Sequence, residues 1–145
     1  MISKYVDDKV TSLKIEAKVD NLPQVMEFIN GILEREGASK SIINQIDVAV
    51  DEIFVNIAKY AYGKTVGYAI IETKIEKDPD AITITFIDEG KRYNPLKKED
   101  PNVEIGSELR DIGGLGIYIV KKTMDFLYYD HRGGNNIFTI KKYFD

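Results

Sequence analysis

The chain has 145 residues, the length of one domain rather than two, and we expect residues 1–145 to form a single domain. Its 20 Lys and Arg residues against 24 Asp and Glu residues give a net charge of −4, which argues against a nucleic-acid-binding module, because such modules carry a basic surface. The absence of cysteine excludes a disulfide framework and a cysteine-ligated zinc site. No apolar run approaches the roughly 20 residues of a membrane span, so we expect a soluble, cytoplasmic protein.

The first half of the chain predicts one strand followed by two helices. Apolar and polar residues alternate over residues 11–19, which is the period of a half-buried strand. Residues 21–36 begin with an N-cap and an early proline and continue with apolar residues at helical spacing. The next helix has Ser39 or Ser41 as its cap and is expected to run to about Tyr62, before a glycine.

The second half predicts four more strands and one more helix: strands near 67–76, 81–88, 126–130 and 136–143, and a helix near 117–124. The first two of these strands are joined by a short, turn-rich link, which is typical of a hairpin. The whole order predicts an α+β protein in which one mixed, mostly antiparallel sheet is covered by helices on one face.

The second predicted helix carries Glu52 and Asn56, which are four residues apart and therefore lie on one helix face. A carboxylate there can accept a proton, and an amide oxygen is a hard ligand suited to Mg²⁺. Asn has a poor propensity for helix interiors, which favours a specific reason for its presence. The alternative is that both residues form the exposed polar flank of an amphipathic helix.

A second candidate site is Asp88, which ends an apolar strand and is followed two residues later by Gly90. A carboxylate can accept a hydrogen bond from an exocyclic amine such as the adenine amino group, and a glycine lets a ligand approach the backbone. A strand followed by Asp and Gly is also an ordinary way for a chain to leave a sheet.

A third candidate is the run Gly113, Gly114, Leu115 and Gly116, which precedes the last predicted helix. Its backbone N–H groups can surround an anion, and the helix N-terminus adds a favourable dipole. The alternative is a flexible loop with a helix start. The run is neither a Walker A loop nor a Rossmann fingerprint, because it lacks the following lysine and the preceding βαβ context. Triphosphate charge would therefore need Mg²⁺ and basic residues elsewhere.

The segment 89–112 shows charges, two prolines and no sustained period, which is typical of a functional lid or a disordered loop. Basic residues in this segment could offset phosphate charge. Among them Arg110 is the strongest candidate, because it lies three residues before the glycines; the complete set is Lys91, Arg92, Lys97, Lys98 and Arg110.

Taken together, these segments resemble the GHKL (Bergerat-fold) ATPases, and most closely the stand-alone anti-sigma-factor serine kinases. The resemblance covers nearly the whole chain. It rests on Ala49–Asn56 with Ala61–Tyr62 for the N box, Asp88–Pro95 for the box D-x-G-x-x-F-D-P, Gly113–Val120 for the box GGLGLYLV, and Asn136–Lys142 for the closing strand. It implies a two-layer α/β sandwich, a histidine-kinase-like ATPase domain, with an ATP lid at about residues 91–113.

Residue by residue, the resemblance implies that Glu52 is the general base, that Asn56 holds Mg²⁺ and that Asp88 reads the adenine amino group. Gly90 would pack close to the base. The other residues expected to contact the nucleotide are Tyr93, Arg110, Gly113, Gly114, Leu115 and Gly116.

The activity that the resemblance implies is an ATP- and Mg²⁺-dependent serine/threonine protein kinase with anti-sigma-factor activity. Its substrate would be a STAS-type anti-anti-sigma protein, a sigma factor would be the competing partner, and the kinase would form a homodimer. No nucleic-acid or membrane partner is expected. The sequence departs from the family pattern at Ile57 and Tyr60, where Ala and His are common, and in Tyr93-Asn94-Pro95. Tyr60 motivates the alternative, a non-catalytic ATP-binding module that sequesters a transcription regulator.

Overall fold

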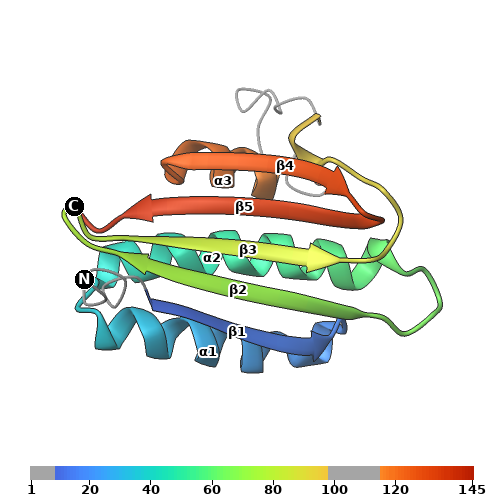
Figure 1. The fold of residues 1–145 in the computed structure, drawn as a ribbon, viewed down its shortest axis with the longest axis horizontal. Coiled ribbons are helices and arrows are strands. Elements are labelled where there is room, and N and C mark those ends of the chain that lie inside the picture. Colours follow the sequence, from blue (N-terminus) through green and yellow to red (C-terminus); the bar gives the residue numbers. More distant parts are fainter. Residues whose placement is uncertain (1–8, 98–114) are drawn as a thin grey trace, which may run out of the picture.

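A five-stranded antiparallel sheet forms one layer of the protein, with the strands in the order β1-β2-β3-β5-β4 (Figure 1). The computed structural model describes residues 9–97 and 115–145. The strands are β1 (Lys9–Glu16), β2 (Tyr68–Glu76), β3 (Ala81–Asp88), β4 (Phe126–Arg132) and β5 (Asn135–Tyr143). All pairings among these strands are antiparallel, so the sheet predicted as mixed and mostly antiparallel has no parallel pair in the described part of the chain.

The second layer consists of α1 (Leu22–Arg35), α2 (Lys40–Asn56) and α3 (Leu115–Thr123), which lie behind the same face of the sheet in Figure 1. Short 3₁₀ turns lie at Val19–Asn21 and Pro95–Lys97, and a π-helical turn lies at Ile57–Ala61. The predicted α+β class, with helices on one face of the sheet, is confirmed. None of the helices in these residues is long and apolar enough to cross a membrane.

The core lies between the helices and the inward-facing side chains of the sheet. On β3 the residues Ile82, Ile84 and Phe86 are buried, which is the alternation expected for a strand with one covered face. The helices contribute buried residues at helical spacing, namely Val25, Ile29, Ile32 and Leu33 of α1 and Ile46, Val50 and Ile53 of α2.

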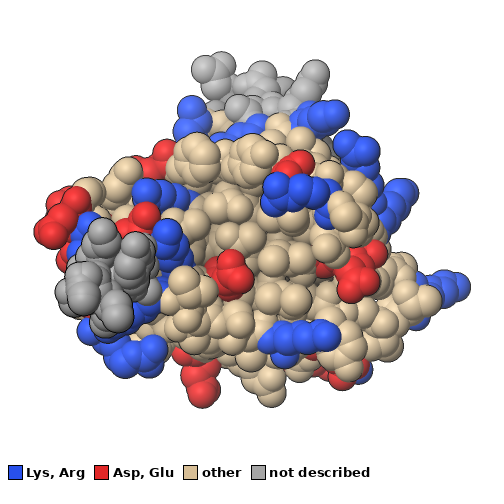
Figure 2. All heavy atoms as spheres, in the orientation of Figure 1, with Lys and Arg blue, Asp and Glu red and all other residues tan. Residues whose placement is uncertain are grey.

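The opposite face of the sheet is not covered by any helix in residues 9–97 and 115–145. Figure 2 shows this face as a broad uncharged area interrupted by separate acidic and basic side chains, with more charged side chains around its edge. Large apolar or aromatic side chains are exposed on its strands, namely Val10, Tyr68, Phe126, Tyr128 and Tyr143. An exposed patch of this kind often marks an interaction surface.

Two predicted boundaries differ from the structure by three residues or more. The first strand ends at Glu16 rather than residue 19, because Asn21 donates its side-chain amide to the Glu16 carbonyl at 2.9 Å and the chain turns there. The α-helical part of the second predicted helix begins after Ser39, whose hydroxyl accepts from the N–H of Ile42, and ends at Asn56. From there to Ala61 the chain forms a π-helical turn instead of a further α-helical turn.

Glu36, which follows α1, joins the helix layer to two strand ends. Its carboxylate accepts hydrogen bonds from Nζ of Lys77 at 2.9 Å and from Nζ of Lys9 at 3.2 Å. The hydrogen bond from Lys77, together with that from Lys9, lowers the pKa of Glu36 despite partial burial of the carboxylate. A carboxyl group with a lowered pKa stabilises the fold above its unfolded-state pKa, and this contribution is lost as the pH falls through its folded-state pKa.

The substitution Glu36→Gln should therefore lower the thermal midpoint at pH 7, and this difference from the wild type should vanish as the pH falls through the lowered pKa of Glu36. Thermal unfolding followed by circular dichroism between pH 7 and pH 3 measures it. Glu34→Gln is the matched control, because Glu34 is exposed on the last turn of α1 and forms no ion pair within the described residues. A wild-type–to–E36Q difference that is constant over this pH range would contradict the assignment.

Candidate functional site

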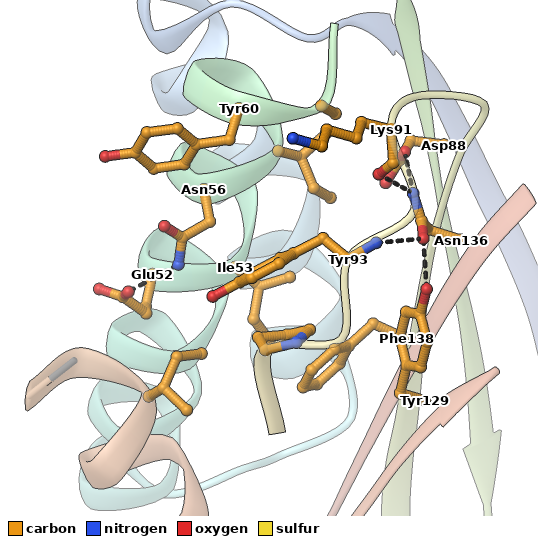
Figure 3. A pocket seen from close by; sticks show the side chains of 14 residues that line it. Glu52, Ile53, Asn56, Tyr60, Asp88, Lys91, Tyr93, Tyr129, Asn136 and Phe138 are labelled. Atoms are coloured by element: carbon orange, nitrogen blue, oxygen red, sulfur yellow. Dashed lines mark hydrogen bonds between the residues drawn. The ribbon is translucent and has the colours of Figure 1, made fainter. Parts of the chain in front are cut away.

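A cavity of about 460 Å³ separates α2 and its π-helical extension from the ends of β3, β4 and β5. Figure 3 shows side chains from both walls pointing into it. Polar residues on its wall include Glu52, Asn56, Tyr60, Asp88, Lys91 and Asn136, and apolar or aromatic residues such as Ile53, Tyr93 and Phe138 form much of the rest. A cavity that is partly apolar and carries a few convergent polar groups is typical of a small-molecule site.

The helix wall presents Glu52 and Asn56 side by side, as their four-residue spacing predicts. The side-chain amide of Asn56 donates a hydrogen bond to Oε2 of Glu52 at 2.7 Å. This contact orients the Asn56 side chain so that its amide oxygen remains available to another ligand. Both side chains are half-buried at the cavity wall, so the alternative of a fully exposed polar helix flank does not describe them.

The beginning of α3 closes against the same carboxylate. Leu115 is the first residue of this helix and Gly116 is the second. A Cβ atom on Gly116 would overlap the carboxylate of Glu52, so a larger residue at this position would force Glu52 to move. The helix start and the candidate general base are therefore in direct contact.

The π-helical turn Ile57–Ala61 brings α2 against the segment that follows β3. The carbonyl of Ala61 accepts a hydrogen bond from the N–H of Lys91 at 2.7 Å. A Cβ atom on Gly90 would overlap the backbone of Ala61, so only glycine allows this approach. Gly90 thus serves the site by packing against the helix wall.

Tyr62, directly after the π-helical turn, forms hydrogen bonds that connect the strands next to this region. Its hydroxyl donates to the carbonyl of Tyr68 and accepts from the N–H of Glu89 at 2.8 Å, which ties together the facing ends of β2 and β3. Burial raises the pKa of the Tyr62 phenol above its usual value, which favours the protonated form that donates to Tyr68.

The sheet wall is built around Asp88 at the end of β3. This carboxylate is 5% exposed, and its Oδ1 atom accepts hydrogen bonds from the N–H of Gly90 and from the side-chain amide of Asn136, each at 2.9 Å. No residue in the described part of the chain donates a hydrogen bond to Oδ2. Asp88 can therefore accept a hydrogen bond from a ligand through that second oxygen.

Asn136 on β5 holds this wall together and was not singled out as a site residue from the sequence. It faces Asp88 in the β3–β5 register and is only 6% exposed. Its amide nitrogen donates to Asp88 and to the Lys91 carbonyl at 2.9 Å, and its oxygen accepts from the Tyr129 hydroxyl and from the N–H of Tyr93 at 3.2 Å. The available signal was a polar residue at an inward-facing position of an otherwise apolar strand.

The structure brings Glu52, Asn56, Asp88 and Tyr93 to one cavity and places Gly90 directly behind it. The predicted site residues Arg110, Gly113 and Gly114, and with them most of the expected lid, lie outside the described residues. Within residues 9–97 and 115–145 there is no cluster of three or more His, Asp or Glu side chains that could hold a metal by itself. Protein cation sites with few protein ligands are completed by oxygens of a bound molecule or of water.

These features define the class of protein. A two-layer α+β fold carries a buried carboxylate acceptor on the sheet wall and a Glu–Asn pair on the long helix, as expected for a histidine-kinase-like ATPase domain. A family described as the histidine kinase-like ATPase domain matches residues 15–142.

Curated relatives make the assignment narrower. The chain is 32% identical over 130 residues to the serine-protein kinase RsbW of Listeria innocua, which covers 85% of this chain and 81% of that protein. The serine-protein kinase RsbW of Listeria monocytogenes gives the same identity and coverage. The serine-protein kinase RsbW of Staphylococcus epidermidis is 27% identical over 137 residues, covering 89% of this chain and 84% of that protein.

Among solved structures, the RsbU and RsbW domains of a Mycobacterium tuberculosis protein superpose with a TM-score of 0.67 and 16% identity. The match covers 92% of this chain and 32% of that longer chain, and it supports the fold. The chain belongs to the histidine kinase-like ATPase family and, within it, to the RsbW serine-protein kinases. It is therefore an ATP-dependent protein kinase, and the resemblance to anti-sigma-factor serine kinases is confirmed.

The contact between Gly116 and Glu52 gives a test of the site. The substitution Gly116→Ala should leave the fold intact, because the overlapping group is the end of a flexible side chain, but it should lower kinase activity by about tenfold or more as the Glu52 carboxylate moves. Phosphate transfer from labelled ATP and thermal unfolding measure the two effects.

Gly31→Ala is the matched control for this test. Gly31 also lies in a helix, but a Cβ atom there meets only the end of Arg35 at 3.7 Å, so alanine should stabilise the protein by up to about 1 kcal/mol and leave activity unchanged. Full kinase activity of G116A would show that catalysis does not depend on the position that the Glu52 carboxylate takes beside Gly116.

Proposed function

We propose that this kinase phosphorylates a serine or threonine of a STAS-type anti-anti-sigma protein, with Glu52 as the general base. The observation that carries the proposal is the position of the Glu52 carboxylate. It lies on the cavity wall, bonded to Asn56 and in contact with the start of α3, while Asp88 lies on the opposite wall. A nucleotide whose base meets Asp88 would direct its phosphates toward the helix wall.

The nucleotide would be recognised at its base by Asp88. The free Oδ2 atom is an acceptor, which suits the adenine amino group, and the half-exposed ring of Tyr93 lines the same cavity. The backbone of Gly113, Gly114, Leu115 and Gly116 would surround the phosphates, and Arg110 would add positive charge; the position of Gly116 beside Glu52 supports this arrangement. In this proposal residues of about 91–113 form the lid over the nucleotide.

Magnesium fits the donor set on the helix wall. The nitrogen of the Asn56 amide donates to Glu52, and no residue in the described part of the chain donates a hydrogen bond to the oxygen of that amide. An amide oxygen completed by phosphate oxygens and water is a common environment for Mg²⁺. When bound, the ion would neutralise charge on the phosphate oxygens.

In the transfer step, the hydroxyl oxygen of the substrate forms a bond to the γ-phosphorus while the bond from that phosphorus to the β,γ-bridging oxygen breaks. ADP leaves with the bridging oxygen. The hydroxyl proton passes to a carboxylate oxygen of Glu52, whose other contact, with the Asn56 amide, holds the side chain in place. Positioning and charge neutralisation supply most of the catalysis in such reactions.

The partners follow from the same assignment. We propose that a sigma factor competes with the STAS-type protein for this kinase, that the kinase forms a homodimer, and that it works in the cytoplasm, where ATP is available. The exposed aromatic side chains on the uncovered sheet face, including Tyr68, Phe126 and Tyr128, support a protein-binding role for that face. We propose no nucleic-acid or membrane partner.

Tyr60 supports a second candidate function. Its side chain is 64% exposed, lines the cavity and carries no charge. A site with less positive charge near the phosphates could bind ATP without transferring phosphate, and the protein would then act as a nucleotide-responsive module that sequesters a transcription regulator. Phosphate transfer from labelled ATP to a STAS-type protein separates the two functions, because the module would bind ATP and give no phosphorylated product.

The substitution Glu52→Gln tests the proposed base. Gln keeps an oxygen that can accept from Asn56, so ATP affinity should stay within about twofold, whereas loss of the base should reduce phosphorylation by about 10²- to 10⁴-fold. Calorimetric titration with ATP and phosphate transfer to the STAS-type protein measure the two quantities. Asp51→Asn is the control, because Asp51 is the exposed neighbour on the same helix. Unchanged phosphorylation by E52Q would remove Glu52 from this role.

A further inference from the structure

Lys91 brings a cationic side chain to the cavity. Among the described lining residues, Lys91 is the only Lys, Arg or His, whereas Glu52 and Asp88 contribute two carboxylates. In Figure 3 the Lys91 side chain extends from the segment after β3 across the cavity in the direction of Tyr60. Without this ammonium group, the only charged side chains on the described wall of the cavity would be carboxylates.

The backbone of Lys91 is fixed on both sides. Its N–H donates to the carbonyl of Ala61 on the helix wall at 2.7 Å, and its carbonyl accepts from the amide of Asn136 on the sheet wall at 2.9 Å. Lys91 therefore bridges the two walls through its main chain, and its Cα position is set by both. A side chain that starts from a fixed point loses less freedom when it binds a ligand.

The ammonium end of Lys91 remains available. It forms no ion pair with any residue that the structure describes, and the side chain is exposed at the cavity. A lysine ammonium acts as a point charge with three donors, which suits the oxygens of a phosphate. The two carboxylates of the described cavity wall, Glu52 and Asp88, form no ion pair with Lys91, and each accepts a hydrogen bond from a neighbouring amide, that of Asn56 or of Asn136.

We propose that Lys91 binds the phosphate chain of the nucleotide and gives the site its preference for ATP and ADP over adenosine. This inference rests on the proposed function, because it takes the base to lie at Asp88 and the terminal phosphate near Asn56. The phosphate chain runs from the nucleoside to the terminal phosphate, so a cation between Asp88 and Asn56 would lie beside that chain. The sequence alone favours Arg110 as the residue that offsets phosphate charge. This inference assigns such a role to Lys91, which lies within the described residues.

The other basic side chains in the segment 89–97, Arg92 and Lys97, do not line the cavity. Arg92 and Lys97 line a neighbouring groove together with Asn94, Asp130 and His131, rather than the cavity that holds Glu52 and Asp88. Lys64 is a charge-matched control, because it is exposed in the turn before β2 and lines neither the cavity nor this groove.

The test compares three ligands, adenosine, ADP and ATP, by calorimetric titration with magnesium present. Lys91→Met removes the charge while both backbone hydrogen bonds remain possible, and Lys91→Arg retains the charge. We expect K91M to weaken ATP and ADP binding by about 10- to 100-fold and to leave adenosine binding within about twofold, as for loss of a charged hydrogen bond. K91R and Lys64→Met should bind all three ligands within about fivefold of the wild type.

Each other result has a distinct meaning. If K91M binds ATP as the wild type does, the phosphate contact is wrong while the proposed function stands. An equal loss for adenosine and ATP would mean that Lys91 shapes the cavity rather than binding phosphate, and would also overturn the inference. If the wild type itself binds neither ATP nor adenosine, both the proposed function and the inference about Lys91 fail. Circular dichroism of K91M confirms that the variant is folded before the titrations are compared.

Discussion

A buried carboxylate paired with a buried amide across two neighbouring strands sets the geometry of the whole cavity. Asp88 of β3 and Asn136 of β5 face each other in register, and both are almost inaccessible to solvent. Burying such groups is unfavourable unless their hydrogen bonds are formed. Oδ1 of Asp88 accepts hydrogen bonds from the Asn136 amide and from the N–H of Gly90. Oδ2 of Asp88 has no donor among the described residues and can accept a hydrogen bond from a ligand.

The position of the helix wall relative to Asp88 and Asn136 depends on a close approach between the backbones of Ala61 and of the segment after β3. The N–H of Lys91 bonds to the carbonyl of Ala61, and the absence of a side chain at Gly90 allows the two backbones to meet. The π-helical turn places Ala61 for this contact, and single π-helical turns occur frequently at functional sites. Glu52 and Asn56 lie on the last turns of α2, directly before this π-helical turn, so the proposed sites for the base and for the phosphates are joined by the same helix.

Much of this arrangement can be predicted from local pattern, and the rest cannot. The i, i+4 spacing of Glu52 and Asn56 and the alternation along β3 are properties of short segments, and both appear in the structure as expected. The role of Asn136 depends on a partner 48 residues away, and the direction of Lys91 depends on a backbone bond to Ala61. The π-helical turn has an apolar periodicity compatible with an α-helix, so its sequence gives no signal for the change of helix type.

The central claim is that the free oxygen of Asp88 selects the base of the bound nucleotide. Calorimetric titration of the wild-type chain with ATP and with GTP, magnesium present, tests it most directly. Adenine offers an amino donor where guanine offers a carbonyl oxygen, which the carboxylate would repel, so ATP should bind about 10- to 100-fold more tightly. Equal affinities, or tighter binding of GTP, would contradict the account.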